Sequence, residues 1–410
     1  GTVTIEDTTT QNNTGANGFG LQVLATGAGS TVTSAILDNI TSSGNANAGI
    51  YGAGSTNGVL GSIEVSNSHA TGGLVQGILF DGVGNGSITT ATVRNSVASG
   101  NTGTGVSARG LTGGDIGTFV ARDMTVQNNT GRGITVSAEA ANSILTSATV
   151  RDSVLSGNGG DGGVYILSQT TGLITAATVS NVQISNNVNR GLYAVALTGG
   201  DIGTLTIDNV TSNNNTAING RGIQIQASNA GSTITTATVT NSTVTGNNSL
   251  GSYNVALDSG VISSLFISGM TATGNFQGIG IDAQTSASIA ATAIQQSTVT
   301  NNTSSGIYIN DDTTGSFVVD LGGGVPGSTG NNRIFSNAAI DVSLDYDNGQ
   351  AKAENNWWGN AAGLQPGRAS LCHHRGKRPY RGLCQSGEVS RRYPRRSWQC
   401  GAGFARRCPD

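Results

Sequence analysis

Residues 91–101 read ATVRNSVASGN, and this stretch contains the pattern that decides the fold. Asn95 and Asn101 stand six residues apart, with an apolar residue two positions before the first Asn. Residues equivalent to Asn95 recur every 27 to 32 residues. In eleven such units, the position equivalent to Asn101 follows six residues later. The octapeptide LTGGDIGT at residues 111–118 recurs unchanged at residues 197–204. The chain is therefore built from an internal repeat.

The two polar positions of the repeat form two columns. The first column is Asp7, Asn39, Asn67, Asn95, Asp123, Asp152, Asn181, Asn209 and Asn241, with Gly269 and Gln296 as late variants. The second is Asn13, Asn45, Gly73, Asn101, Asn129, Asn158, Asn187, Asn215, Asn247, Asn275 and Asn302. Asn and Gly tolerate the left-handed backbone of sharp turns. Stacked Asn amides can also hydrogen-bond from one repeat to the next. We therefore expect two polar ladders at turns.

Between the turns the sequence is typical of short strands. Residues 90–94 alternate in polarity, and a further apolar column follows a glycine, as at Ile50, Val106 and Ile134. A unit of about 28 residues cannot bury its own apolar face, so units must stack, one per strand spacing of about 4.8 Å. The sequence predicts an all-β parallel solenoid of about 11 coils with three strands each, followed by closing coils.

The closing segment carries a family resemblance. It contains DLGGG at residues 320–324, NNRIF at 331–335 and ENNWWG at 354–359. With the Asn columns, these motifs resemble the right-handed parallel β-helix repeats of the pectin-lyase-like superfamily, in bacterial secreted proteins. The resemblance implies a single right-handed parallel β-helix and an extracellular or cell-surface location. We expect repeats over residues 1–310, closing coils over 311–364, and Trp357 with Trp358 plugging the end of the core.

Residues 365–410 have a different composition. They hold 11 Lys and Arg residues and two Asp and Glu residues, which gives a net charge of +9. Residues 1–364 hold nine Lys and Arg residues and 21 Asp and Glu residues, which gives a net charge of −12. All four cysteines lie in this tail, 12, 16 and 8 residues apart, which matches no zinc-finger spacing. We interpret the tail as disordered or translated out of frame. A disulfide or metal mini-domain and a basic arm are the alternatives.

Composition also limits the partners of the repeat body. Its acidic balance argues against nucleic acid. No apolar run approaches the 18 or so residues of a spanning helix, so we expect no transmembrane segment, and any leader peptide is absent or removed. The oligomeric state cannot be derived from the sequence.

The resemblance implies carboxylates with an Arg or Lys base in a lyase, or paired Asp residues in a hydrolase. Only Asp311-Asp312 stands out, and we expect it in a turn without a catalytic role. Asp345 and Asp347 resemble half of a calcium loop, so Ca²⁺ is the one cofactor that the sequence suggests. A plain turn is the competing interpretation.

Basic residues are concentrated in one window. Arg94, Arg122 and Arg151 each directly precede the first polar column, and Arg109 and Arg132 fall in the same window. Three stacked guanidinium groups about 5 Å apart repel one another unless anions neutralise them. We predict that these five arginines bind an anionic glycan. In the competing interpretation, the neighbouring carboxylates of Asp123 and Asp152 neutralise a solvated face.

Tyr51, Tyr165, Tyr193 and Tyr308 define an aromatic column, in which Tyr165 and Tyr193 are expected to stack as a sugar platform or to stabilise the solenoid. Taken together, the sequence favours a non-catalytic surface or adhesion-type protein that binds polysaccharide or another cell surface through its long faces. A polysaccharide lyase or glycoside hydrolase acting on acidic polysaccharide, and a structural filament or surface-layer unit, are the alternatives.

Overall fold

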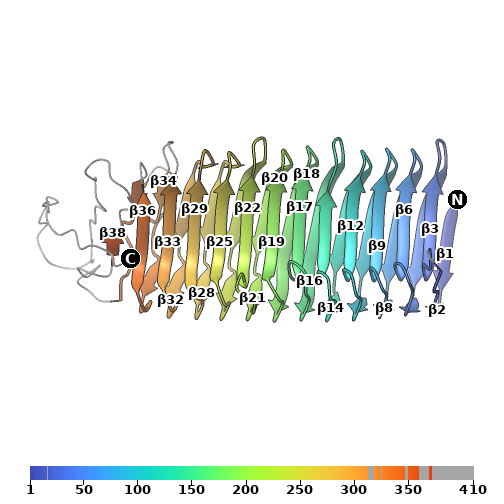
Figure 1. Ribbon diagram of the computed structural model, residues 1–410, viewed down its shortest axis with the longest axis horizontal. Helices are drawn as coiled ribbons and strands as arrows, with labels where there is room; N and C mark the ends of the chain where they lie inside the picture. The colour runs from blue at the N-terminus through green and yellow to red at the C-terminus, as the bar shows by residue number, and fades with distance from the viewer. Residues whose placement is uncertain (16, 313–317, 325, 347–349, 360–368, 372–410) are drawn as a thin grey trace, which may run out of the picture.

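The computed structural model describes residues 1–15, 17–312, 318–324, 326–346, 350–359 and 369–371. The described residues form a single parallel β-helix whose coils stack along one axis from the N-terminal end (Figure 1). One coil shows the plan: a long strand β10 (Ser87–Arg94), a short strand β11 (Val97–Ser99) and a third strand β12 (Val106–Leu111). The expected three strands per coil are confirmed.

The strands form two parallel sheets. Sheet A contains the long and short strands, which turn into one another at the first polar column. Its long strands are β1 (Thr2–Glu6), β4 (Thr31–Asp38), β7 (Val59–Ser66), β10, β13 (Asp115–Arg122), β16 (Ile144–Ser156), β18 (Leu173–Ser185), β20 (Asp201–Asp208), β23 (Thr233–Thr240), β26 (Val261–Ile262) with β27 (Leu265–Ser268), β30 (Ser288–Ile289) with β31 (Thr292–Gln295), β34 (Val318–Asp320) and β37 (Gln350–Lys352). Its separate short strands are β2 (Thr9–Gln11), β5 (Thr41–Ser43), β8 (His69–Thr71), β11, β14 (Thr125–Gln127), β21 (Thr211–Asn213), β24 (Thr243–Thr245), β28 (Thr271–Thr273), β32 (Thr298–Thr300) and β35 (Arg333–Phe335).

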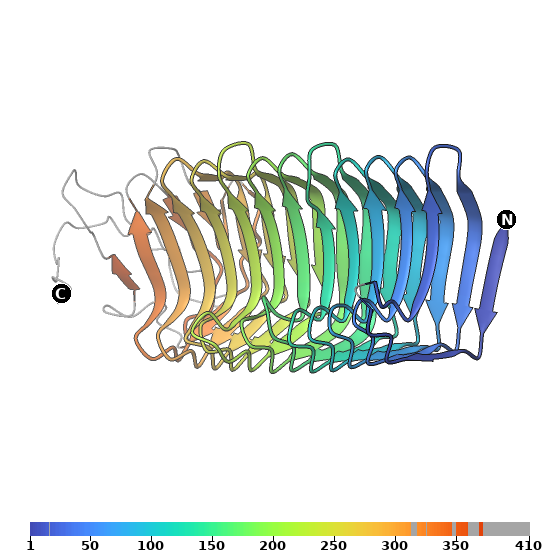
Figure 2. The same ribbon diagram turned by 45° about the vertical axis from the view of Figure 1, so that its right-hand side comes forward.

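Sheet B contains the third strand of every coil, and Figure 2 shows how the turns beside it line up along the solenoid. Its strands are β3 (Leu21–Thr26), β6 (Ile50–Ser55), β9 (Ile78–Val83), β12, β15 (Ile134–Ala138), β17 (Val164–Gln169), β19 (Arg190–Leu197), β22 (Arg221–Ser228), β25 (Leu250–Leu257), β29 (Gln277–Gln284), β33 (Ser305–Asp312), β36 (Ile340–Tyr346) and β38 (Ala369–Leu371). Three residues of the tail thus pair with β36. Its four cysteines lie outside the described residues.

The apolar columns predicted from the sequence meet in one core that runs the length of the solenoid. Val93, Ala98 and Val106 of one coil are all fully buried in it. Identical positions of successive coils pair in register, as Val93 pairs with Ala121. Burying such columns against one another is the main source of stability in a stacked repeat.

The two polar columns have different environments. Non-glycine members of the first column adopt the left-handed region, with φ from 46° to 56°. The second column is buried from Asn45 onward, and its amides form a ladder: the Asn129 Nδ2 donates to Asn158 Oδ1 at 2.9 Å, and the Asn158 Nδ2 donates to Asn187 Oδ1 at 3.1 Å. These bonds satisfy polar groups that the turns bury.

The last coils depart from two expectations. Asp311 and Asp312 do not form a turn, because β33 extends through both of them to pair with Ala283 and Gln284 of β29. Only Trp358 joins the core, where it is 4% exposed. Trp357 faces the other way, is 41% exposed and packs against Phe335 with 4.7 Å between ring centroids. The expected two-residue plug is therefore a single tryptophan.

Candidate functional site

The arginine row of sheet A forms as predicted but is neutralised within the protein. Arg94 pairs in register with Arg122, and Arg122 with Arg151. Their guanidinium groups make ion pairs with Glu64 at 2.6 Å, with Asp123 at 2.7 Å and with Asp152, respectively. These pairs are half-exposed, where ion pairs are weak and screened by salt. The row therefore carries equal numbers of positive and negative groups, which favours the interpretation as a solvated face.

Arg109 and Arg132 do not lie with this row, because they belong to the coil segments that build sheet B. Arg109 on β12 forms a two-pronged ion pair with Asp81, at 2.9 and 3.0 Å. Asp81 is 4% exposed, so this pair is fixed within the sheet surface. Arg132 precedes β15, and its Nη2 lies 2.5 Å from Asp161 Oδ2. The five arginines of this sequence window are therefore divided between the two sheets.

The outward face of sheet B carries a second, smaller apolar cluster. It consists of Tyr165, Leu167, Tyr193 and Val195, separate from the main core. Tyr165 and Tyr193 pair in register as predicted, with 5.4 Å between ring centroids. They are only 6% and 8% exposed, and burial raises the pKa of Tyr193 to about 12. Their ring faces are therefore not an open platform on which a sugar could stack.

Arginines cover these rings instead. The Arg132 guanidinium lies 3.7 Å from the Tyr165 ring centroid, and the Arg190 guanidinium lies 4.3 Å from that of Tyr193. The same arrangement recurs further along the face, where Arg221 lies 4.4 Å from the Tyr253 ring centroid. Cations are attracted to aromatic faces, more strongly where water is excluded. Each tyrosine thus fixes a guanidinium group at the surface of sheet B.

Arg190 and Arg221 are the centre of this arrangement, which we call the arginine–tyrosine face (Arg132, Tyr165, Arg190, Tyr193, Arg221 and Tyr253). They pair in register on β19 and β22. The Gln224 Oε1 accepts hydrogen bonds from the Arg190 Nε and, at 2.7 Å, from the Arg221 Nη1. Two adjacent guanidinium groups are thus held side by side through one neutral amide.

The acidic groups do not match the cations on this face. Asp161 lies within ion-pair distance of both Arg132 and Arg190, at 2.5 and 3.1 Å. Among the residues that the structure describes, no carboxylate forms an ion pair with Arg221. Its buried Nε also lacks a hydrogen-bond acceptor. Burial lowers the pKa of Arg221, and the charge of Arg190 adds to this effect. Asp161 is thus the one described carboxylate that forms ion pairs with these three cations, while Asp282, which accepts a hydrogen bond from the Tyr253 hydroxyl group, acts on Arg221 without forming an ion pair. An additional anion in contact with Arg221 would be stabilised here.

The sequence contains a signal for this face. Each of its three arginines is followed by glycine, at residues 132–133, 190–191 and 221–222. The glycine is required because the next coil approaches closely: a Cβ at Gly191 would lie 1.8 Å from Ser212 Oγ and 2.6 Å from Gly222 O. The Arg-Gly pair therefore places an arginine at the start of a sheet B strand, beside the tyrosine column.

The calcium candidate is only partly described. Asp345 lies on β36 in register with Asn310, and Asp347 lies outside the described residues. Within the described part of the chain, no group of three or more His, Cys, Asp or Glu side chains is placed to hold a metal ion. Over the same residues, no helix is long and apolar enough to cross a membrane.

The fold makes this chain a parallel β-helix repeat protein. Residues 194–362 match the family model described as "Protein of unknown function (DUF1565)", which covers less than half of the chain. Among solved structures, the chain is similar to the TibC-catalyzed hyper-glycosylated TibA55-350 fragment, with a TM-score of 0.26 and 14% identity over 88% of this chain and 99% of that chain. No curated protein matches the sequence.

Proposed function

We propose that this chain is the β-helix of a bacterial extracellular or surface protein that binds an acidic glycan or another anionic surface polymer without catalysing a reaction on it. The observation that carries the proposal is the Arg190–Arg221 pair, in which Arg221 has no carboxylate partner among the described residues. Guanidinium groups bind carboxylate and sulfate groups through paired hydrogen bonds.

The geometry favours a polymer over a small anion. The arginine–tyrosine face extends from Arg132 to Arg221, across strands that lie about 4.8 Å apart. A chain that carries an anionic group on each sugar could contact several guanidinium groups at once. Individually weak contacts then add through multivalency.

The test compares two double variants with the same change in net charge. Arg190→Gln with Arg221→Gln removes two cations from the arginine–tyrosine face, and Arg122→Gln with Arg151→Gln removes two from the sheet A row. We expect retention on polygalacturonate or dextran sulfate, measured by affinity electrophoresis, to be lost in the first variant and kept in the second. Uncharged dextran is the ligand control.

Salt provides an independent readout. Binding should weaken as ionic strength rises, because the Debye length falls to about 10 Å at 0.1 M salt. If the sheet A variant loses binding and the sheet B variant keeps it, the anion site is the Arg94–Arg122–Arg151 row. If wild type binds neither polymer, the proposal is refuted.

A polysaccharide lyase is the second candidate, because Arg221 is a partly buried guanidinium group that forms no ion pair with a described carboxylate, and burial lowers its pKa. A base that removes a proton next to a uronate carboxylate must lose its own proton, and desolvation of a cation promotes this loss. Incubation with polygalacturonate would then yield unsaturated products with ultraviolet absorbance, abolished by Arg221→Gln. We expect no such products.

A further inference from the structure

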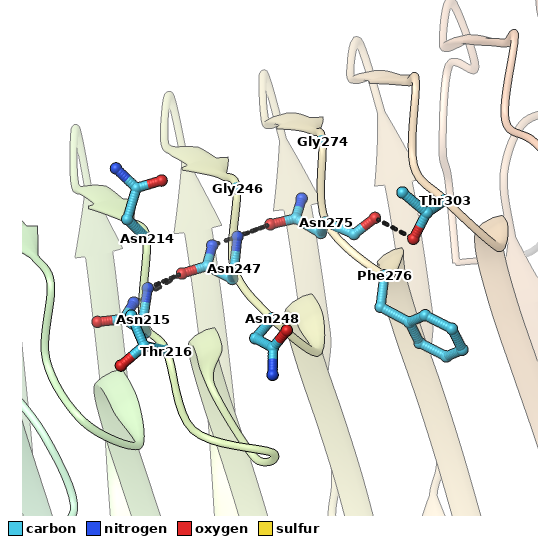
Figure 3. Close-up of a pocket in the computed structure, with 10 residues that line it drawn as sticks. All are labelled: Asn214, Asn215, Thr216, Gly246, Asn247, Asn248, Gly274, Asn275, Phe276 and Thr303. Atoms are coloured by element: carbon cyan, nitrogen blue, oxygen red, sulfur yellow. Dashed lines mark hydrogen bonds between the residues drawn. The ribbon is translucent and has the colours of Figure 1, made fainter.

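A shallow hollow of about 480 Å³ lies on the turn edge of the solenoid (Figure 3). It follows the turns after β21, β24, β28 and β32, in four successive coils. Its floor is the backbone of Asn215, Asn247 and Asn275, whose buried side chains belong to the inner Asn ladder. The floor is therefore one of the most rigidly hydrogen-bonded parts of the molecule.

Glycines open one side of this hollow. Gly246 and Gly274 adopt φ of 64° and 67°, at a position where other coils carry Asn with a similar φ, as at Asn214 and Asn301. A Cβ on Gly274 would meet its nearest neighbour only at 3.7 Å, so a side chain there would project into free space. Glycine occupies the same position at Gly44, Gly72, Gly100 and Gly157, and beside this hollow it leaves room that an Asn side chain would fill.

The opposite side carries an exposed aromatic ring among neutral polar groups. Figure 3 shows Asn248 and Phe276 on one side of the Asn ladder and Gly246 and Gly274 on the other. Phe276 is 50% exposed, which is unusual for a residue of its size on this molecule. The Asn248 Nδ2 donates to Ala217 O at 3.1 Å, which directs the amide beside the ring and leaves its carbonyl oxygen as an acceptor.

The lining contains no charged side chain. Besides Phe276, it presents the hydroxyl groups of Thr216 and Thr303 and the amides of Asn214 and Asn248. A hydroxyl group can donate and accept, and an amide can do both at separate atoms. These groups suit a ligand with hydroxyl groups at its rim and C–H groups on one face. A pyranose ring has this character, and an anionic sugar would gain nothing here from charge.

We propose that this hollow is a second carbohydrate site, one that binds a neutral hexose polymer with one sugar ring against Phe276. It differs from the anion site in its chemistry, because its lining contains no cation, although the turns after β21 and β24 lead into β22 and β25 of the arginine–tyrosine face. The protein then holds two kinds of glycan at once, an acidic one on sheet B and a neutral one along the turn edge.

The test uses affinity electrophoresis of the full chain in gels that contain a soluble glucan, mannan or galactan, at 1 M NaCl. The Debye length is then only about 3 Å, so the arginine–tyrosine face contributes little. We expect wild type to be retarded by at least one of these polymers, and Phe276→Ala to bind it about tenfold more weakly or worse.

Gly274→Asn is the second variant, because Asn occupies the same backbone position in other coils and fills the hollow without disturbing the ladder. Gly100→Asn is its matched control, since Gly100 has the same left-handed backbone with φ of 65° in a distant coil. We expect Gly274→Asn to abolish retardation and Gly100→Asn to leave it unchanged. Equal binding by wild type, Phe276→Ala and Gly274→Asn would overturn the proposal, as would the absence of retardation by any of the three polymers.

Discussion

Replacement of one ladder asparagine tests how much the inner column contributes to stability. Asn158 is fully buried, and its Oδ1 accepts hydrogen bonds from the Asn129 Nδ2 at 2.9 Å and from the Asn129 N at 3.3 Å. Its Nδ2 donates to Asn187 Oδ1 and to Val126 O, both at 3.1 Å. Asn158→Ala removes all four bonds, and Ala is free of backbone strain there because Asn158 is not among the residues with positive φ.

The magnitude follows from the donors left unpaired. Asn129 loses an acceptor for its backbone N–H and for one side-chain N–H, whereas Asn187 Oδ1 keeps the Asn158 backbone N–H at 3.0 Å. A buried donor without a partner costs about 1–3 kcal/mol, so two such donors cost about 2–6 kcal/mol. A local loss of about 3 kcal/mol corresponds to hydrogen exchange that is faster by on the order of 100-fold.

Native-state hydrogen exchange is the suitable assay, because a long repeat does not unfold in two states and a global midpoint would average over all coils. We expect the loss of protection to be confined to the coils around residues 125–190. The control is Asn95→Gly, which removes an exposed ladder amide and keeps the φ of 46° that glycine tolerates. If Asn158→Ala raises exchange no more than Asn95→Gly does, buried amide ladders do not stabilise this solenoid as argued.

Three further predictions concern single positions. Asp320→Asn should speed hydrogen exchange of the backbone amides across residues 320–328. The buried carboxylate accepts hydrogen bonds from four backbone N–H groups at 2.8–3.0 Å, and the side-chain amide of Asn cannot accept all four. Unchanged protection would contradict this. Gly191→Ala should speed hydrogen exchange in the coils around residues 185–225, because its Cβ would lie 1.8 Å from Ser212 Oγ and 2.6 Å from the backbone oxygen of Gly222, and wild-type protection there would refute the close approach. Burial raises the pKa of Tyr193 from 10.0 to about 12, so its contribution to stability is complete below pH 10 and is lost as the pH rises towards 12. Tyr193→Phe should remove one late-ionising tyrosine from the ultraviolet pH titration of the folded protein, and an unchanged titration curve would count against the burial of its hydroxyl group.

Much of the fold could be predicted from the sequence, because in a stacked repeat the number of residues between two positions determines where they lie relative to one another in the solenoid. Residues such as Arg94 and Arg122, which are one repeat apart, must lie in register on adjacent strands. The alternation of apolar residues also determined which side of each strand faces the core, and the left-handed turns required Asn, Asp or Gly. The columns of tyrosine and arginine were therefore predictable as columns.

Only the tertiary structure decided how the charges pair and which columns share a face. Arg94 and Arg109 are close in sequence, but the turn between them places one on sheet A and the other on sheet B. The Arg122–Asp123 and Arg151–Asp152 ion pairs join sequence neighbours and could be anticipated, but others form between coils, as Asp161 does with Arg190, so no spacing within one repeat could indicate them. The sequence determined the scaffold because backbone stacking is periodic. The structure decided the candidate site, because side chains of different lengths find their partners across two or three neighbouring coils.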